Sequence, residues 1–194
     1  SGDYADSTIY AFNGSSIANV DAGTSDYITM FGYAIVYDGA LYFQGKDSSD
    51  SYSMYTFDGT SMTKITGGSS SYVNSFGQPA IYNGTLYFQG YNGTTYKIFA
   101  FDGSSITDIS VDSECDYDSW FSNSIEYDNT LYFSGKNTSG DYMMFAFDGS
   151  SVTNVKTHSD LDYAESFEDP IIYDGKIYFY GKNSSGDNKI YCFY

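Results

Sequence analysis

Short apolar segments alternate with polar turns along the whole chain, and their order repeats about every 45 residues. The clearest marker is Leu41-Tyr42-Phe43, which returns as Leu86-Tyr87-Phe88, Leu131-Tyr132-Phe133 and Ile177-Tyr178-Phe179. Each copy is followed two positions later by a glycine, at Gly45, Gly90, Gly135 and Gly181. Internal repeats of this length are typical of propellers and solenoids.

Each repeat predicts four short strands. In the third copy they are expected at residues 124–127, 131–136, 143–147 and 152–155. Pairs such as Asp38-Gly39 accept the positive φ of a two-residue hairpin, and Gly- and Ser-rich turns separate the other strands. Because Tyr, Phe, Ile, Val and Thr fill the segments, helix is disfavoured. A four-stranded antiparallel meander follows.

The apolar residues do not alternate cleanly within these strands. Leu41, Tyr42 and Phe43 place bulk on both faces of the sheet, which is typical of a sheet covered on both sides. The 23 Tyr and 15 Phe residues suit the wide wedges between few blades. The pattern therefore predicts an all-β, four-bladed β-propeller of four-stranded antiparallel blades.

One domain, residues 1–194, is expected. Its repeats cover approximately residues 21–65, 66–109, 110–155 and 156–194, with residues 9–20 completing the last unit, so that an N-terminal strand closes the last blade.

One strand is surplus to this ring. The third-strand segment occurs five times, at residues 9–12, 54–57, 98–101, 144–147 and 190–193, whereas the other three strands occur four times. Residues 9–12 and 190–193 therefore compete for one slot. Either one of them lies outside the ring, or it pairs with another molecule and gives self-association by strand addition.

A further motif spans three of the third-strand segments and the turn after each. It reads Met54-Tyr55-Thr56-Phe57-Asp58-Gly59-Thr60 in the first repeat, and similar runs occupy residues 98–104 and 144–150. This motif resembles that of bacterial secreted β-propeller repeats, whose units end in a Leu-Trp or Leu-Tyr pair followed by Asp-Gly-Thr. The resemblance covers nearly the whole chain and concerns the fold. It implies a surface or exported binding module, although Phe stands here where Trp is frequent in that family.

Charge excludes several partners. Eight Lys and no Arg face 25 acidic residues, giving a formal charge of −17. Nucleic-acid binding needs clustered basic residues, so it is not expected. No apolar run of about 18 residues is present, so membrane insertion is not expected either. The Tyr-, Ser- and Asn-rich composition favours an extracellular or cell-surface location. Cys115 and Cys192 permit one disulfide.

The connection before each first strand carries Tyr-x-x-x-Phe, beginning at Tyr27, Tyr72, Tyr117 and Tyr163. One interpretation is core packing repeated by duplication. The other is a ring of aromatic platforms for a glycan or a protein ligand at the propeller mouth. Trp120, the only tryptophan, lies in the third copy of this connection and joins the predicted ligand-binding residues.

The same connection in repeat three places acidic residues at alternate positions, Asp112, Glu114, Asp116 and Asp118. Carboxylate oxygens on one side of an extended segment suit Ca²⁺, although the spacing is not that of an EF-hand. A solvated acidic loop is the alternative. No other cofactor is expected.

The fourth repeat adds a further acidic group: His158, Asp160, Asp162, Glu165, Glu168 and Asp169. A glycosidase carboxylate pair is one hypothesis, but acidic residues are so frequent here that close pairs arise without function. The sequence favours a non-catalytic extracellular recognition or adhesion module. A structural subunit of a surface filament or layer, built by terminal strand addition, is the alternative, and a carbohydrate-active enzyme is the weaker one.

Overall fold

The computed structural model describes residues 9–20, 27–47, 49–66, 72–109, 111, 115–155 and 163–194, with the backbone alone for residues 27–30. These residues form 17 strands and no helix. All pairings between these strands are antiparallel. The predicted all-β class is therefore confirmed. No described segment is a helix with the length and apolar character that crossing a membrane requires.

The strands form five sheets in chain order. The N-terminal hairpin contains β1 (Tyr10–Phe12) and β2 (Ile17–Asn19). The first sheet contains β3 (Tyr27–Tyr37), β4 (Ala40–Asp47), β5 (Tyr52–Phe57) and β6 (Met62–Lys64). The second contains β7 (Asn74–Tyr82), β8 (Thr85–Tyr91), β9 (Tyr96–Phe101) and β10 (Ile106–Asp108). The third contains β11 (Tyr117–Tyr127), β12 (Thr130–Asn137), β13 (Tyr142–Phe147) and β14 (Val152–Asn154). The fourth contains β15 (Tyr163–Tyr173), β16 (Lys176–Asn183) and β17 (Asn188–Phe193).

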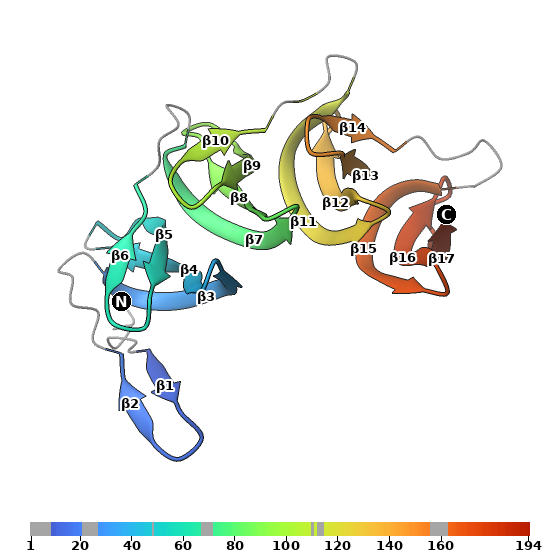
Figure 1. Ribbon diagram of the computed structural model, residues 1–194. Helices are drawn as coiled ribbons and strands as arrows, with labels where there is room; N and C mark the ends of the chain where they lie inside the picture. Colours follow the sequence, from blue (N-terminus) through green and yellow to red (C-terminus); the bar gives the residue numbers. More distant parts are fainter. Residues whose placement is uncertain are drawn as a thin grey trace.

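The first strand of each repeat is longer than the sequence predicts. β11 begins at Tyr117, so the Tyr-x-x-x-Phe segment lies in a strand and not in a connecting loop. The reason is a pair of left-handed residues, Trp120 (φ 75°) and Asn123 (φ 49°), with register shifts against β12 on either side. Such irregularities bend a strand and increase its twist. Figure 1 shows the resulting curvature of β7, β11 and β15.

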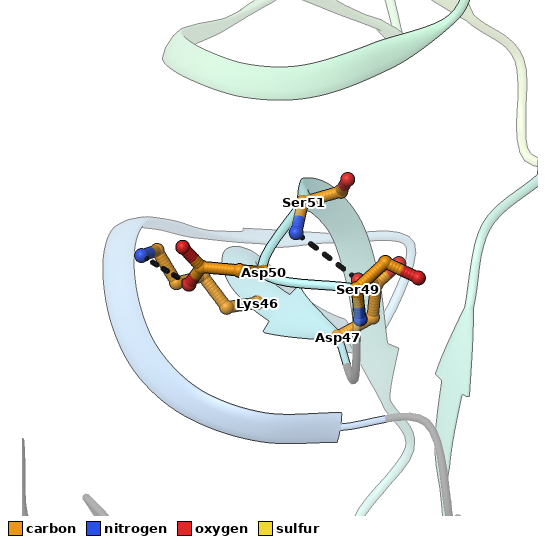
Figure 2. A network of polar contacts seen from close by, with 5 residues as sticks. All are labelled: Lys46, Asp47, Ser49, Asp50 and Ser51. Carbon is orange, nitrogen blue, oxygen red and sulfur yellow. Dashed lines mark hydrogen bonds and ion pairs between the residues drawn. The ribbon is translucent and has the colours of Figure 1, made fainter.

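Side-chain oxygens organise the turns between strands. Between β4 and β5, Asp47 Oδ1 accepts hydrogen bonds from the backbone N–H groups of Ser49 (2.9 Å) and Ser51 (3.1 Å), while Lys46 pairs with Asp50 (Figure 2). A hydrogen bond from Lys64 Nζ to Asp47 Oδ2, at 2.5 Å, lowers the pKa of the Asp47 carboxyl. A turn in which an Asp or Asn side chain accepts hydrogen bonds from the following backbone N–H groups is an Asx turn, which explains why Asp and Asn recur at these positions.

The recurrent glycine after each Leu-Tyr-Phe segment has a packing origin. A Cβ added at Gly135 would lie 2.8 Å from Phe145 Cδ2 and 2.8 Å from Tyr117 Cε2, closer than real Cβ contacts come. The corresponding position at Gly90 is similarly crowded by Phe99 and Tyr72. Glycine is therefore required where two aromatic rings of the same sheet cross the strand.

The core lies between consecutive sheets. We call the face of a sheet that is turned toward the next sheet along the chain its downstream face. One buried cluster joins the downstream face of the first sheet to the second sheet, another joins the second to the third, and another joins the third to the fourth. A smaller cluster packs Ile9 and Val20, which flank the N-terminal hairpin, on the first sheet through Phe43, Tyr55 and Met62.

The same two contacts recur at all three junctions. The tyrosine that ends each first strand donates its hydroxyl to a carbonyl of the next sheet's hairpin turn: Tyr37 to Gly84 (3.0 Å), Tyr82 to Asn129 (2.5 Å) and Tyr127 to Gly175 (2.5 Å). A second tyrosine packs on a phenylalanine of the next sheet: Tyr42 on Phe101, Tyr87 on Phe147 and Tyr132 on Phe193, with centroids 5.5, 5.1 and 5.2 Å apart.

The four repeat sheets lie in an open, curved row, with β1 and β2 at one end and β15–β17 at the other (Figure 1). The predicted closure, in which an N-terminal strand completes the last blade, is not present among the described residues. β2 pairs with β1, and Ile9 and Val20 pack on the first sheet. No core cluster of the described residues joins the first sheet to the fourth.

Candidate functional site

A cavity of about 250 Å³ lies between the third and fourth sheets, beside Trp120. β11 contributes Trp120, Ser122 and Asn123 to its lining, and β12 and β13 contribute Ser134 and Tyr142. From β15 come Glu168 and Asp169, both exposed. The cavity thus combines aromatic rings with hydroxyl, amide and carboxylate groups.

One repeat position differs beside this cavity. The residue after Leu-Tyr-Phe is Gln44 in the first sheet and Gln89 in the second, and both bridge a junction. Gln44 Nε2 donates to Ser75 Oγ (3.3 Å) and Gln89 Nε2 donates to the carbonyl of Phe121 (3.4 Å). In the third sheet this residue is Ser134, whose side chain is too short to span the junction. The space that the glutamine would occupy is therefore open.

Trp120 is also the exception at its position. The equivalent residues in β7 and β15 are Ser75 and Ser166, which share its left-handed backbone (φ 73° and 71°) and are buried. Positive φ is uncommon for a bulky residue, and such residues are frequent at functional sites. The bulge itself is structural, because it recurs in β7, β11 and β15. Among these three strands, only β11 carries a large aromatic side chain on it.

Neighbouring rings hold Trp120 in place. Tyr96 of β9 and Tyr142 of β13 lie edge-on to it, with centroids 6.0 and 6.2 Å away. Lys136 Nζ lies 5.6 Å from the Trp120 centroid and 4.8 Å from that of Tyr142. Tyr96 and Tyr142 are each more than a third exposed, so this aromatic group is open to solvent at the mouth of the cavity.

The other predicted aromatic platforms are placed differently. Tyr72, Tyr117 and Tyr163 pack edge-on against two rings of their own sheet, as Tyr117 does with Phe133 (6.0 Å) and Phe145 (5.2 Å). Burial raises the pKa of all three hydroxyls. This geometry favours the core-packing interpretation for these three residues.

The side chain of the fourth member, Tyr27, lies outside the described residues.

Tyr117 has a second role, at the bulge of β11. Its hydroxyl donates to the carbonyl of Trp120 at 2.7 Å, as Tyr72 does to Ser75 at 2.8 Å. A core tyrosine therefore fixes the backbone from which Trp120 projects.

The predicted calcium ligands are described only in part. Asp112 and Glu114 lie outside the described residues, Asp118 is exposed, and Asp116 Oδ1 accepts a hydrogen bond from Asn154 Nδ2 at 2.5 Å. Within the ranges given above, no three His, Cys, Asp or Glu residues are grouped as metal ligands. The calcium site stays a prediction.

The acidic group of the fourth repeat is also described in part. His158, Asp160 and Asp162 lie outside the described residues, and Glu165 pairs with Lys182 at 3.1 Å.

The one disulfide that the sequence permits is not formed, since Cys115 and Cys192 are not bonded to each other.

A second cavity of about 300 Å³ lies between the second and third sheets. Its lining includes Lys97, Asp108, Val111 and Tyr117. It lacks an accessible aromatic group like that around Trp120, and we regard the Trp120 cavity as the candidate site.

Comparison with known proteins adds no family to this description. The chain matches no protein-family model, and no curated protein sequence matches it.

Proposed function

We propose that this protein is a non-catalytic extracellular recognition module that binds a neutral glycan in the Trp120 cavity. The observation that carries the proposal is that two residues that differ from their equivalents in the sibling repeats line the same cavity. Ser134 replaces the bridging glutamine and opens a space, and Trp120 replaces a serine and supplies an aromatic wall to the same space.

The chemistry of the lining suits a sugar. Aromatic rings give apolar contact at low cost in conformational entropy, and a few placed polar groups give orientation. Asn123, Glu168 and Asp169 can accept hydrogen bonds from sugar hydroxyl groups. A volume of about 250 Å³ is slightly below the range of roughly 300–1,000 Å³ typical of drug-sized ligands. One sugar residue at the end of a glycan is a ligand of suitable size.

The charge of the molecule supports a neutral ligand. A net charge of −17 repels polyanions and anionic glycans, and Glu168 and Asp169 place that charge at the cavity itself. The extracellular location rests on composition, since the chain has no Arg and is rich in Tyr, Ser and Asn.

The experiment is a glycan array followed by calorimetry with the strongest neutral hit. Two variants borrow residues from sibling repeats, so their effect on folding is expected to be small. Ser134→Gln restores the bridging side chain of Gln44 and Gln89 and should block the cavity. Trp120→Ser restores the residue of Ser75 and Ser166 and should remove the aromatic wall.

Both variants should lower the affinity at least tenfold. The thermal midpoint should be kept or rise in Ser134→Gln and fall slightly in Trp120→Ser, which loses the ring contacts with Tyr96 and Tyr142. A wild-type protein that binds no glycan on the array, or a Ser134→Gln variant that binds as the wild type does, would contradict the proposal. A hit that is hydrolysed, with released sugar seen by chromatography, would replace it with a carbohydrate-active enzyme. An anionic glycan as the best ligand would contradict the charge argument.

A further inference from the structure

The downstream face of the fourth sheet carries the equivalents of residues that are buried or half-buried at the other junctions. Tyr173 is the equivalent of Tyr37, Tyr82 and Tyr127 in the first three repeats. Ile190 is the equivalent of Met54, Ile98 and Met144. Tyr82 is 0% exposed and Ile98 is 5% exposed, whereas Tyr173 is 71% exposed and Ile190 is 78% exposed. Ile171 lies on the same strand as Tyr173 and is also exposed. Strands β15 to β17 therefore present a junction surface on which none of the described residues packs.

The edge of this sheet is open as well. In the other repeat sheets a short fourth strand, β6, β10 or β14, pairs with the third strand, whereas β17 pairs only with β16 among the described residues. The N-terminal hairpin has the opposite deficiency. β1 and β2 are equivalent to a third and a fourth strand, and the sheet order places no first or second strand beside them among the described residues.

β1 and β17 are copies of one element. Residues 9–12 read Ile-Tyr-Ala-Phe and residues 190–193 read Ile-Tyr-Cys-Phe. Val20 N donates to Ile9 O at 2.8 Å, as Ile65 N donates to Met54 O and Val155 N to Met144 O in complete sheets. The hairpin thus holds the same register as a third and fourth strand elsewhere.

β1 is weakly held in its place. Tyr10 is 66% exposed and Phe12 is 68% exposed, whereas the equivalent Tyr191 of β17 is buried in the fourth sheet. In the part of the chain that the structure describes, β1 has no first and second strands of its own to cover Tyr10. A strand with so little buried surface can be displaced at small cost.

We propose that the fourth sheet of one copy docks on the first sheet of a second copy, with β17 taking the place of β1. β2 of the second copy then becomes the fourth strand of the first copy's last sheet. Ile190 takes the position of Ile9 over the core residues Phe43, Tyr55 and Met62. The partner is a second copy because its first sheet is the one described surface that continues the repeat.

The contacts expected at this junction follow from the three junctions inside the chain. Tyr173 donates its hydroxyl to the carbonyl of Gly39, which is equivalent to Gly84, Asn129 and Gly175. Tyr178 packs on Phe57, which is half-buried in the first sheet. A heterologous contact of this kind joins copies head to tail, so it builds rings of molecules where the rotation closes and open chains where it does not.

Sedimentation and light scattering of the 194-residue chain at several concentrations test the proposal. The wild type should show association that increases with concentration. Salt should strengthen it, since copies of charge −17 repel one another. Ile190→Asp places a carboxylate in the junction and should weaken association by roughly a hundredfold or more.

Ile172→Glu is the matched control. Ile172 is exposed on the same sheet, and its equivalent in the third repeat is Glu126, also exposed, so this position tolerates a carboxylate. The control should associate as the wild type does. Equal loss in both variants, or a wild type that stays monomeric at every concentration, would overturn the proposal.

Register gives a second test that does not depend on affinity. Ala146 lies opposite Thr153 in the third sheet, so the equivalent Cys192 is expected opposite Ala18 of the second copy, where Ala11 now lies. Directly opposed strand residues have Cα atoms about 5 Å apart, within the range that a disulfide spans. Ala18→Cys in a Cys115→Ser background, oxidised with glutathione disulfide, should give covalent oligomers on a non-reducing gel.

The same gel separates the alternatives. A bond between the introduced thiol and Cys192 within single chains would show the four-bladed ring that the sequence predicts and would overturn docking between copies. If Cys192 forms no bond with the introduced thiol, either within or between chains, the downstream face is covered by something else and the proposal is also overturned. Asn19→Cys, one position out of register, should give much less product.

Discussion

The second and the fourth sheets are built from closely similar residues and differ in what covers them. The second sheet is packed on both faces, by the first and the third sheets. The fourth is packed on one face only among the described residues, so that Ile190 is exposed where Ile98 is buried. The comparison separates two kinds of interaction in a repeat: contacts within a sheet, which are the same in both, and contacts between sheets, which are not.

The largest effect on stability is expected from truncating the isoleucine whose exposure differs most between these two sheets, Ile98 in the second and Ile190 in the fourth. Ile98→Ala should lower the free energy of unfolding by about 2–5 kcal/mol, because it leaves a cavity in a packed junction. Ile190→Ala should change it by less than about 0.5 kcal/mol, as is usual at an exposed position. Urea unfolding at low protein concentration measures both. Similar losses in the two variants would show that the fourth sheet is covered in solution.

Contacts within a sheet should contribute equally to stability in the covered and the uncovered sheets. Gly135→Ala forces a Cβ to within 2.8 Å of two rings of its own sheet, and Gly181→Ala forces one to within 2.9 Å of the Tyr163 ring and of the carbonyl oxygen of Ser166. Overpacking of this kind costs about 1–3 kcal/mol, and the two variants should lose similar amounts. A much smaller loss for Gly181→Ala would mean that the fourth sheet is loosely packed throughout and not only uncovered on one face.

A smaller difference is expected for the junction tyrosines. Tyr82→Phe removes a buried hydroxyl that donates to the carbonyl of Asn129 and should cost about 0.5–1.5 kcal/mol. Tyr173→Phe removes an exposed hydroxyl and should cost nothing measurable in the monomer. In the docked assembly Tyr173→Phe should weaken association, which concentration-dependent sedimentation would detect.

The smallest effect concerns acid. Hydrogen bonds from Ser105 N, Ser104 N and the Ser104 hydroxyl lower the pKa of Asp102 below its ordinary value of 3.8. A carboxyl whose pKa is lower in the folded state adds stability that is complete above the unfolded pKa and is lost as the pH falls through the folded pKa. The contribution of this turn therefore weakens below about pH 4.

Asp102→Asn should retain the turn, because Asn13 accepts the same hydrogen bonds from Ser15 and Ser16 in the N-terminal hairpin. The variant's thermal midpoint should fall less steeply between about pH 5 and about pH 2 than that of the wild type. Among the described residues no such turn follows β17, so this acid sensitivity is expected in the sheets that have a fourth strand. Parallel pH profiles for the two proteins would contradict the assignment.

Much of the fold could be predicted from the sequence because local chemistry decides it. The Leu-Tyr-Phe segments and Asp-Gly turns placed the strands and hairpins close to where they lie. The long first strands were missed because non-glycine residues at positive φ, such as Ser75 and Trp120, read as a loop. Ring closure was wrongly expected because the pattern indicates which faces meet and does not indicate the angle between them.

The candidate site was predictable in part. Trp120 was found because it is unique in the chain. Ser134 was missed, although the signal was present: aligned repeats read Gln44, Gln89, Ser134 and Tyr180 at one position. Its meaning depends on knowing that the glutamine spans a junction, and only the positions of neighbouring sheets reveal that. The buried roles of Tyr72 and Tyr117 were one of two interpretations that the sequence left open.

In the proposed docking, the downstream face and open edge of the fourth sheet take the same contacts that are buried between the interior sheets. Amide hydrogen exchange of β17, followed by mass spectrometry over a range of protein concentrations, tests it most directly. Protection of β17 should increase with protein concentration toward that of β13, its equivalent in the third sheet. Fast exchange of β17 that is independent of concentration, while β13 stays protected, would contradict it.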